Sequence, residues 1–243
     1  LCNFIALMPV GVPKIPQYEF EDRTSEVEEP EYDYENWDEN EDENGDENDG
    51  EYEYADAEEK FDWVDLPNLL YEERILFLTR KINNELANQI MGLLTYLSIE
   101  DETTDLTLFI NCLGGWVKAG LAIYDMMQAV PPDVNTIGGG AVASMASLIL
   151  AAGETSKRLA FPHARIMIHQ PAGLFSNLET GELAREINEL TNMRKTLTRE
   201  YAKKTGQPFS IIYADMDRDH FMSAQEAQTH GIVDFVADEL SSY

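Results

Sequence analysis

The spacing of apolar residues between positions 61 and 243 switches repeatedly between a helical and a strand-like period. Leucines and isoleucines recur every three or four residues over Glu85–Leu97, which predicts an amphipathic helix there. The same criterion, with Pro or Gly as stop signals, predicts helices over Leu121–Val130, Ala143–Ala152 and Gly181–Lys204. Short apolar runs predict strands over Leu106–Asn111, Val134–Ile137 and Arg165–His169. Because strands alternate with helices, we expect an α/β domain with parallel strands and crossover helices.

Residues 17–60 have a different composition, in which Glu, Asp and Asn dominate and are interrupted by tyrosines and Trp37. The formal net charge is −29, and about half of all acidic residues fall between Glu19 and Asp65. Such a segment cannot bury enough apolar surface to offset the entropy lost on ordering. We therefore predict a head at 1–16, a disordered acidic insertion at 17–60 and a folded domain at 61–243. Docking of the aromatic residues on a partner is the alternative for the insertion.

The acidic balance argues against binding of nucleic acid or of an anionic membrane surface through bulk charge. No apolar run approaches the ~20 residues that a membrane-spanning helix needs. Cys2 and Cys112 are too few for a disulfide framework and lack the spacing of metal ligands. We expect free thiols in a reducing compartment, no metal site, no nucleic-acid partner and no membrane partner.

Two glycine clusters, Gly114–Gly115 and Gly138–Gly140, follow predicted strands. Glycines at such positions let backbone N–H groups face a ligand, because no side chain intervenes. They can cradle a phosphate, form an oxyanion hole or simply make turns. Neither cluster matches the fingerprint of a dinucleotide or P-loop site. The spacing alone leaves these three interpretations open.

Three kinds of side chain are candidates for hydrolytic chemistry. Ser144 lies near the start of a predicted helix, where its hydroxyl meets the positive end of the dipole or acts only as an N-cap. Ser147, one turn later, is expected to serve as buried packing. His169 ends a predicted strand, where it suits a general base or a structural role. The aspartates of Asp215–Asp219 either orient an imidazole or form a solvated face. The residues alone therefore indicate, at most, a hydrolase.

Several motifs resemble those of one family in the same order along the chain. They are GGGAVASMAS at 138–147, FPHARIMIHQP at 161–171, DRDHFMSAQEA at 217–227, GIVD at 231–234, and FIN followed by Gly114–Gly115. The family is the proteolytic subunit of the ATP-dependent Clp protease. The head MPVGVPKIP at 8–16 is similar to that of the plastid-encoded members. The resemblance covers Asp62–Ala237 and the head.

The resemblance implies a serine endopeptidase, with one role for each matching residue. Ser144 is the nucleophile, His169 the general base, and Asp219 the carboxylate that orients the imidazolium. The backbone N–H groups of Gly115 and Met145 form the oxyanion hole. No cofactor or metal is implied for this subunit, because in the family a separate unfoldase uses the ATP.

The resemblance also implies a fold, an assembly and a location. The fold is the ClpP/crotonase-like α/β fold with repeated β-β-α units, in which Gly181–Lys204 is the handle helix. Members form two stacked seven-membered rings with other Clp proteolytic subunits, both catalytic and non-catalytic, and dock an AAA+ chaperone ring that delivers unfolded proteins. Arg218 matches an arginine that couples ring docking to triad geometry. Similarity to plastid-encoded members places the chain in the chloroplast stroma.

Departures from the family pattern keep other functions open. Cys112–Leu113 replaces the usual Ser-Pro, and the loss of the proline is expected to loosen the turn that follows. Ala146 replaces a usual glycine, so we expect a lower rate. The alternatives are a catalytically weak or silent subunit of a mixed ring, an acyl-CoA enzyme of the crotonase kind, and, for the acidic segment alone, a binding module.

Overall fold

The computed structural model describes residues 14–18, 61–173 and 179–237. Contacts divide the chain into two units, Leu1–Leu69 and Leu70–Tyr243. In the first unit, β1 (Lys14–Tyr18) pairs antiparallel with β2 (Phe61–Asp65). Helix α1 (Leu66–Glu72) follows directly after β2.

The strand β1 includes two residues of the segment that was predicted to be disordered. Gln17 and Tyr18 were assigned to the disordered segment, but they pair with Asp62 and Phe61 of β2. Pairing with a distant strand, which composition does not register, orders these two residues. Residues 19–60 lie outside the described residues, so their disorder stays a prediction, as do the boundaries of the head, insertion and domain.

The second unit is built on a sheet that has seven strands within the described ranges. Its strands are β3 (Ile75–Leu78), β4 (Leu106–Cys112), β5 (Val134–Ala143), β6 (Arg158–Ala160), β7 (Arg165–Ile168), β8 (His220–Ser223) and β9 (Phe235–Val236). The order is β3-β4-β5-β6-β9, with β7 paired to β5 and β8 to β7. All pairs are parallel except β7–β8. The predicted α/β class with parallel strands is confirmed.

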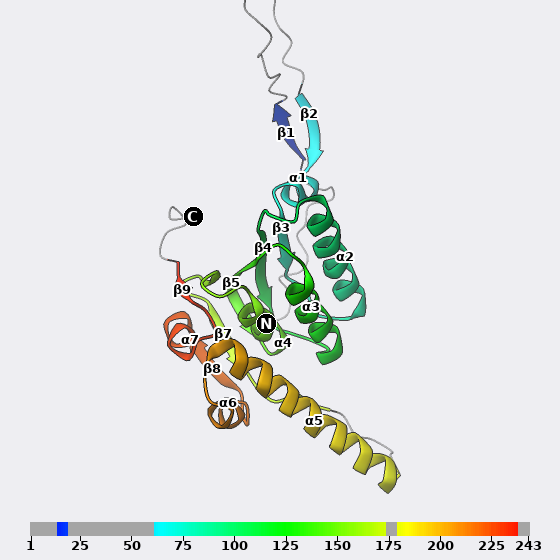
Figure 1. Ribbon diagram of the computed structural model, residues 1–243, viewed down its shortest axis with the longest axis vertical. Helices are drawn as coiled ribbons and strands as arrows, with labels where there is room; N and C mark the ends of the chain where they lie inside the picture. Colours follow the sequence, from blue (N-terminus) through cyan, green and yellow to red (C-terminus); the bar gives the residue numbers. More distant parts are fainter. Residues whose placement is uncertain (1–13, 19–60, 174–178, 238–243) are drawn as a thin grey trace, which may run out of the picture. The chain divides into compact units, whose positions relative to one another are not determined.

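Helices connect the strands of the sheet (Figure 1). They are α2 (Asn84–Glu100), α3 (Val117–Ala129), α4 (Met145–Ala152), α5 (Thr180–Thr205), α6 (Phe209–Asp215) and α7 (Ala224–His230). Helix α2 begins where Asn83 Oδ1 accepts a hydrogen bond from the Leu86 N–H at 2.9 Å. All eight residues of α4 are buried, so α4 is the central helix of the core. Burial of each large aliphatic side chain contributes about 1.5–3 kcal/mol.

Strand β5 runs further than its sequence suggested. The glycines Gly138–Gly140 were expected to end it, but it continues to Ala143. Its first part pairs with β6 through Gly138, and its last three residues pair with β7. The glycines therefore mark the bend at which β5 changes partner, as glycines inside strands often do. This continuation delivers the chain directly to Ser144.

Helix α5 packs on the rest of the unit by its C-terminal half. Its buried residues are Leu197, Thr198 and Tyr201, whereas its first half extends away from the sheet (Figure 1). The helix ends at Gly206, whose φ of 73° is a left-handed cap that glycine adopts without strain. The predicted helix Gly181–Lys204 is thus confirmed to within one residue at each end.

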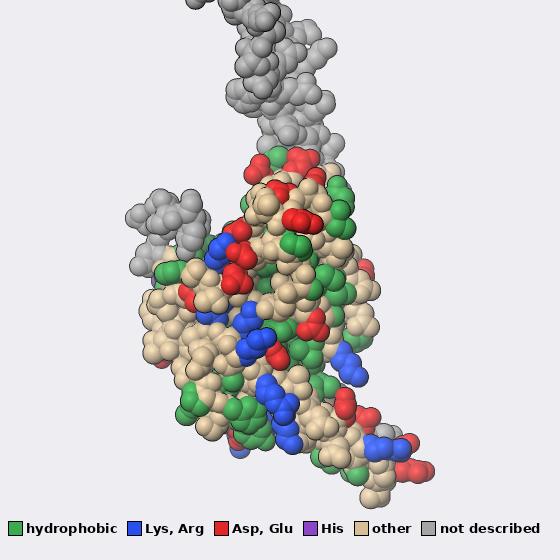
Figure 2. Space-filling view, viewed as in Figure 1, with side chains coloured by type: hydrophobic (Ala, Val, Ile, Leu, Met, Phe, Trp, Pro, Cys, Tyr) green, Lys and Arg blue, Asp and Glu red, His purple; other side chains and the backbone are tan. Residues whose placement is uncertain are grey.

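Charges of both signs are intermixed on the face of the second unit that Figure 2 shows. This distribution agrees with a net charge that is concentrated between Glu19 and Asp65. Within the described ranges, no helix combines the length and the apolar character needed to cross a bilayer.

A nearly buried ion pair joins β6 to the C-terminal segment. The Arg158 guanidinium donates to both carboxylate oxygens of Asp234, at 2.9 and 2.7 Å. Arg158 also donates to the carbonyls of Ala151 and Lys204. Burial alone would raise the pKa of Asp234, but the hydrogen bonds and charge of Arg158 outweigh it and lower the pKa. The pair therefore stabilises the fold while Asp234 is ionised.

We predict that Asp234→Asn lowers the free energy of unfolding by about 3–5 kcal/mol, because the Arg158 charge stays buried without its counter-ion. The folded-state pKa of Asp234 lies below its unfolded value. Its contribution is therefore complete above about pH 4 and is lost as the pH falls through the folded pKa. Urea unfolding of parent and variant at fixed protein concentration, from pH 7 to pH 3, measures both effects. A stability difference that does not shrink in acid would contradict the prediction.

Candidate active site

Ser144 lies at the junction between β5 and α4 in a conformation that L-residues rarely adopt. Its φ is 58° and its ψ is −128°, a strain worth about 1–3 kcal/mol. The Ser144 N–H donates to the Met167 carbonyl of β7 at 2.9 Å. Ser144 occupies the N-cap position of α4, but its side chain makes no capping hydrogen bond to that helix. The hydroxyl is left for another partner.

That partner is His169, which in turn contacts Asp219. Ser144 Oγ lies 2.9 Å from His169 Nε2, and His169 Nδ1 lies 3.0 Å from Asp219 Oδ1. The side chains of His169 and Asp219 are 29% and 61% exposed, so the outer end of this chain of hydrogen bonds faces solvent. The structure thus brings together the three residues that the sequence motifs singled out.

Strand pairing explains how His169 and Asp219, fifty residues apart, become neighbours. In the antiparallel β7–β8 pair, Ile168 stands opposite His220. His169 is the residue after Ile168 and Asp219 is the residue before His220, so both leave the same end of the pair. The interpretation of the aspartate run as a solvated face alone is therefore wrong for Asp219.

The loops that carry His169 and Asp219 are tied together by Arg194 of α5. Its guanidinium donates to Gln170 Oε1 at 2.7 Å and to Asp217 Oδ1 at 3.3 Å. It also lies 3.8 Å over the ring of Tyr213. Sequence reasoning did not identify Arg194, because a basic residue in an amphipathic helix carries no signal of its distant partners.

The turn Gly114–Gly115 lies against the Ser144 backbone. A Cβ on Gly114, whose φ is 88°, would come within 2.7 Å of Ser144 Cβ. A Cβ on Gly115 would overlap the Ile82 carbonyl, so only glycine fits this approach. The N–H of Gly115 donates no hydrogen bond within the described part of the chain. Met145 is the first residue of α4, so its N–H has no intrahelical acceptor.

These two N–H groups belong to neighbouring segments beside the serine, which favours the oxyanion-hole interpretation for Gly114–Gly115. The second glycine cluster takes no part in it, since its members lie within β5.

Cys112 restrains the same turn. Its Sγ lies 3.0 Å from the Arg80 carbonyl and 3.3 Å from the Gly114 nitrogen, which donates to it. Burial raises the pKa of the Cys112 thiol, so it remains protonated and donates to Arg80. Loss of the proline was expected to loosen this turn, and the hydrogen bonds of the Cys112 thiol restrain it.

Arg218 stands immediately before Asp219 with an exposed side chain. The described residues include no group of three or more side chains arranged to hold a metal ion.

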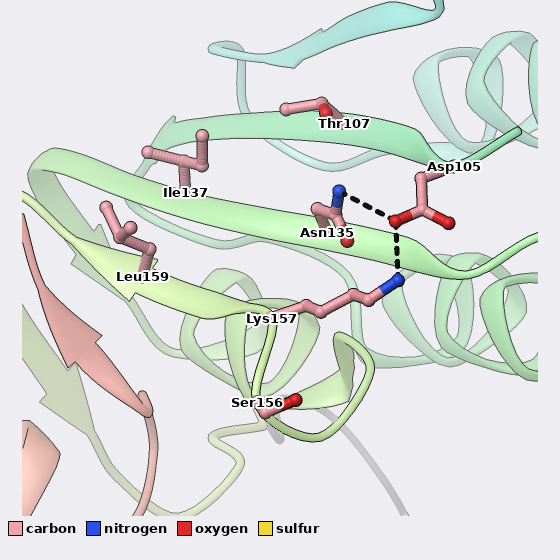
Figure 3. Close-up of a pocket in the computed structure, with 7 residues that line it drawn as sticks. All are labelled: Asp105, Thr107, Asn135, Ile137, Ser156, Lys157 and Leu159. Carbon is pink, nitrogen blue, oxygen red and sulfur yellow. Dashed lines mark hydrogen bonds and ion pairs between the residues drawn. The ribbon is translucent and has the colours of Figure 1, made fainter. Parts of the chain in front are cut away.

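A separate pocket of about 250 Å³ lies over the sheet, and Figure 3 shows its lining residues. Lys157 donates to Asp105 and, at 2.9 Å, to Asp133, and Asn135 also donates to Asp105. The hydrogen bond to Asp105 raises the pKa of Lys157. The raised pKa keeps Lys157 protonated, so its amine is not an activated nucleophile.

Comparison with known proteins agrees with this geometry. The family model described as Clp protease matches residues 57–239. The chain is 59% identical over 183 residues to an "ATP-dependent Clp protease proteolytic subunit" of Lactuca sativa, covering 75% of this chain and 93% of that protein. Proteins of the same name from Platanus occidentalis and Nicotiana tabacum are also 59% identical, over 76% and 75% of this chain and 92% and 93% of theirs. These matches set aside the crotonase alternative. The α/β sheet and the Ser144–His169–Asp219 contacts are consistent with them. Because the match extends over three quarters of its length, this chain belongs to the Clp protease family.

Proposed function

We propose that the chain is a serine endopeptidase whose catalytic residues are Ser144, His169 and Asp219. The observation that carries the proposal is the continuous pair of hydrogen bonds, 2.9 Å from serine to histidine and 3.0 Å from histidine to aspartate. A hydroxyl becomes a nucleophile when a base accepts its proton, and the base is effective when a third group orients it. Membership of the Clp protease family implies a peptidase.

In the proposed reaction, Ser144 Oγ attacks the peptide carbonyl while His169 Nε2 accepts the hydroxyl proton. Asp219, at His169 Nδ1, holds the imidazole in one tautomer and stabilises the imidazolium. His169 then returns the proton to the leaving amine, which departs and leaves an acyl ester on Ser144. Water, deprotonated by His169, hydrolyses this ester and regenerates the hydroxyl.

The negative oxygen of each tetrahedral intermediate would be held by the N–H groups of Gly115 and Met145. Within the part of the chain that the structure describes, neither N–H donates a hydrogen bond, and Met145 adds the positive end of α4. Preorganised donors of this kind are worth about 10²–10³ in rate for each one. The mechanism uses no metal and no cofactor in this subunit.

We further propose that the chain works inside stacked heptameric rings of Clp proteolytic subunits, catalytic and non-catalytic, capped by an AAA+ unfoldase that uses ATP. The names of the relatives contain the words ATP-dependent and subunit. Two features support an assembly: Ile187 of α5 is 50% exposed, and the Asp219 carboxylate is 61% exposed. Burial at an interface would strengthen the His169–Asp219 contact, because solvent screens exposed charges.

The substrates in this proposal are unfolded proteins, and the compartment is the chloroplast stroma. Support for the compartment comes from the plant origin of the relatives and from the similarity of the head to plastid-encoded members. The alternative is a weak or silent ring subunit, which the departures at Cys112, Leu113 and Ala146 keep open. Measurement of catalysis by this chain decides between the two.

We predict that Ser144→Ala abolishes peptide hydrolysis and labelling by a fluorophosphonate probe, because the nucleophilic oxygen is removed. Native mass spectrometry should show unchanged assembly. The measurement uses rings in which every other subunit carries an inactivated serine. Hydrolysis by Ser144→Ala at the parental rate rules out Ser144 as nucleophile, and an unlabelled, inactive parent supports the silent-subunit alternative.

The Cys112 restraint leads to a second prediction. Cys112→Ala should lower the free energy of unfolding by about 1–3 kcal/mol and slow hydrolysis, because the Gly114 N–H loses its buried acceptor. Cys112→Ser, which keeps a donor and an acceptor, should retain most of the rate. Equal rates for the alanine and serine variants would show that the hydrogen bonds of the thiol do not matter.

A third prediction concerns Arg218. If this arginine couples ring docking to the triad, Arg218→Ala should shift stacked rings towards single rings and lower activity in parallel. Analytical ultracentrifugation and peptide hydrolysis on the same samples measure the two effects. A monomeric protein that is active at micromolar concentration would be incompatible with the proposed assembly.

A further inference from the structure

Ser147 is buried and joins three segments around the nucleophile. Its Oγ lies 2.6 Å from the Ser144 carbonyl oxygen, 2.7 Å from the Met167 carbonyl oxygen and 2.9 Å from the Tyr201 hydroxyl. The Tyr201 hydroxyl also lies 3.1 Å from the Ser144 carbonyl oxygen. Ser147 was expected to be buried packing, and it is fully buried, but its hydroxyl belongs to a polar cluster.

The protons of this cluster are limited. Each hydroxyl has one proton, and the carbonyls of Ser144 and Met167 only accept. A hydroxyl proton reaches the Ser144 carbonyl in two ways: Tyr201 donates to Ser147, which donates to Ser144, or Tyr201 donates to Ser144 while Ser147 donates to Met167. If Tyr201 donated to Ser147 and Ser147 to Met167, the Ser144 carbonyl would have no hydroxyl donor. The proposal therefore rests on the first two arrangements, in which the Ser144 carbonyl accepts one hydroxyl proton and each hydroxyl has an acceptor.

Tyr201 is suited to be the permanent donor of the pair. It lies on α5 and its side chain is buried, which raises the pKa of its hydroxyl well above the ordinary value. The phenol therefore keeps its proton throughout the range in which a peptidase works. A buried phenol without an acceptor would be costly, and the acceptors within reach are Ser147 and the Ser144 carbonyl.

The Ser144 carbonyl has particular importance because it shares a peptide plane with the Met145 N–H. The peptide unit is planar and trans, so its C=O and N–H point in opposite directions. A group that fixes the direction of the Ser144 carbonyl therefore fixes the direction of the Met145 N–H as well. The Ser147 N–H of the first turn of α4 also donates to this carbonyl, at 3.0 Å. The hydroxyls add a second hold on a carbonyl whose residue has a strained, positive φ that persists only when its surroundings specify it.

We propose that Ser147 and Tyr201 are positioning residues that hold the Ser144 carbonyl and thereby aim the Met145 N–H at the developing oxyanion. The inference rests on the proposed serine mechanism and adds two residues to it. Neither side chain touches the substrate. Met167 links the same cluster to β7, the strand that leads to His169, so one hydroxyl pair aligns the nucleophile with the strand of its base.

The test uses Ser147→Ala and Tyr201→Phe in assembled rings whose other subunits carry inactivated serines. Each variant should lower kcat about 10-fold and leave KM within about 2-fold, because the oxyanion exists only in the transition state and intermediate. The expected loss is smaller than the ~10²–10³ for removal of a donor, because the N–H is misdirected rather than lost. The double variant should lose little more than either single one, since the two hydroxyls act as a unit.

The matched control is Thr198→Val. Thr198 is fully buried on the same helix, one turn from Tyr201, and its hydroxyl donates to the Arg194 carbonyl. The Thr198→Val substitution therefore removes a buried hydroxyl from α5 that does not contact the Ser144 carbonyl. The kcat of this variant should stay at the parental value.

Two further readouts separate positioning from general damage. A peptide boronate forms a tetrahedral adduct, so its affinity should fall in step with kcat/KM in the positioning variants. The fraction of sites that a fluorophosphonate finally labels should remain parental, whereas misfolding would reduce that fraction. Tyr201→Phe retains the aromatic packing, so it tests the positioning role by itself if Ser147→Ala does not fold.

The inference is overturned if the parent is active and Ser147→Ala and Tyr201→Phe match Thr198→Val in kcat. It is also overturned if KM rises while kcat is unchanged. If the parent protein neither hydrolyses peptides nor reacts with the probe, the proposed serine-peptidase function is itself contradicted. That outcome is distinguishable from failure of the positioning role, which requires an active parent.

Discussion

The backbone conformation of Ser144 is the constraint on which the rest of the site depends. A positive φ at the end of β5 turns the chain abruptly into α4 and leaves the hydroxyl facing His169. Such a conformation costs free energy and persists only when its surroundings specify it. Here β7 accepts the Ser144 N–H, while the first turn of α4 and two buried hydroxyls hold its carbonyl. The hydrogen bonds of the polar cluster therefore help to maintain the strained backbone conformation of Ser144.

Helix α5 supports both sides of the triad from a single face. Arg194 and Tyr201 are seven residues apart, which is two helical turns, so their side chains project in the same direction. Tyr201 reaches the Ser144 carbonyl, and Arg194 joins the loops that carry His169 and Asp219. The packing of α5 on the sheet and the geometry of the site therefore depend on the same side chains.

The acidic segment stands apart from this arrangement. The family model begins to match at residue 57, and the match to the Lactuca sativa protein covers 75% of the chain. Most of the acidic residues between Glu19 and Asp65 thus lie outside the shared region. Family membership consequently explains the folded unit and its triad, and the charge of the insertion needs an explanation of its own.

Local patterning was sufficient to predict the α/β class and the helices that became α2, α4 and α5, because periodicity reports which face of an element is buried. The ordered motifs were sufficient to select Ser144, His169 and Asp219. Tertiary contacts decided the continuation of β5 beyond Gly138, which depends on a change of strand partner. They also decided the hydrogen bonds of Cys112 to Arg80, Arg194 to Gln170 and Tyr201 to Ser144, whose partners lie 24 to 57 residues away. Spacing along a chain carries no signal for such partners, because they become neighbours only when the sheet and α5 have packed together.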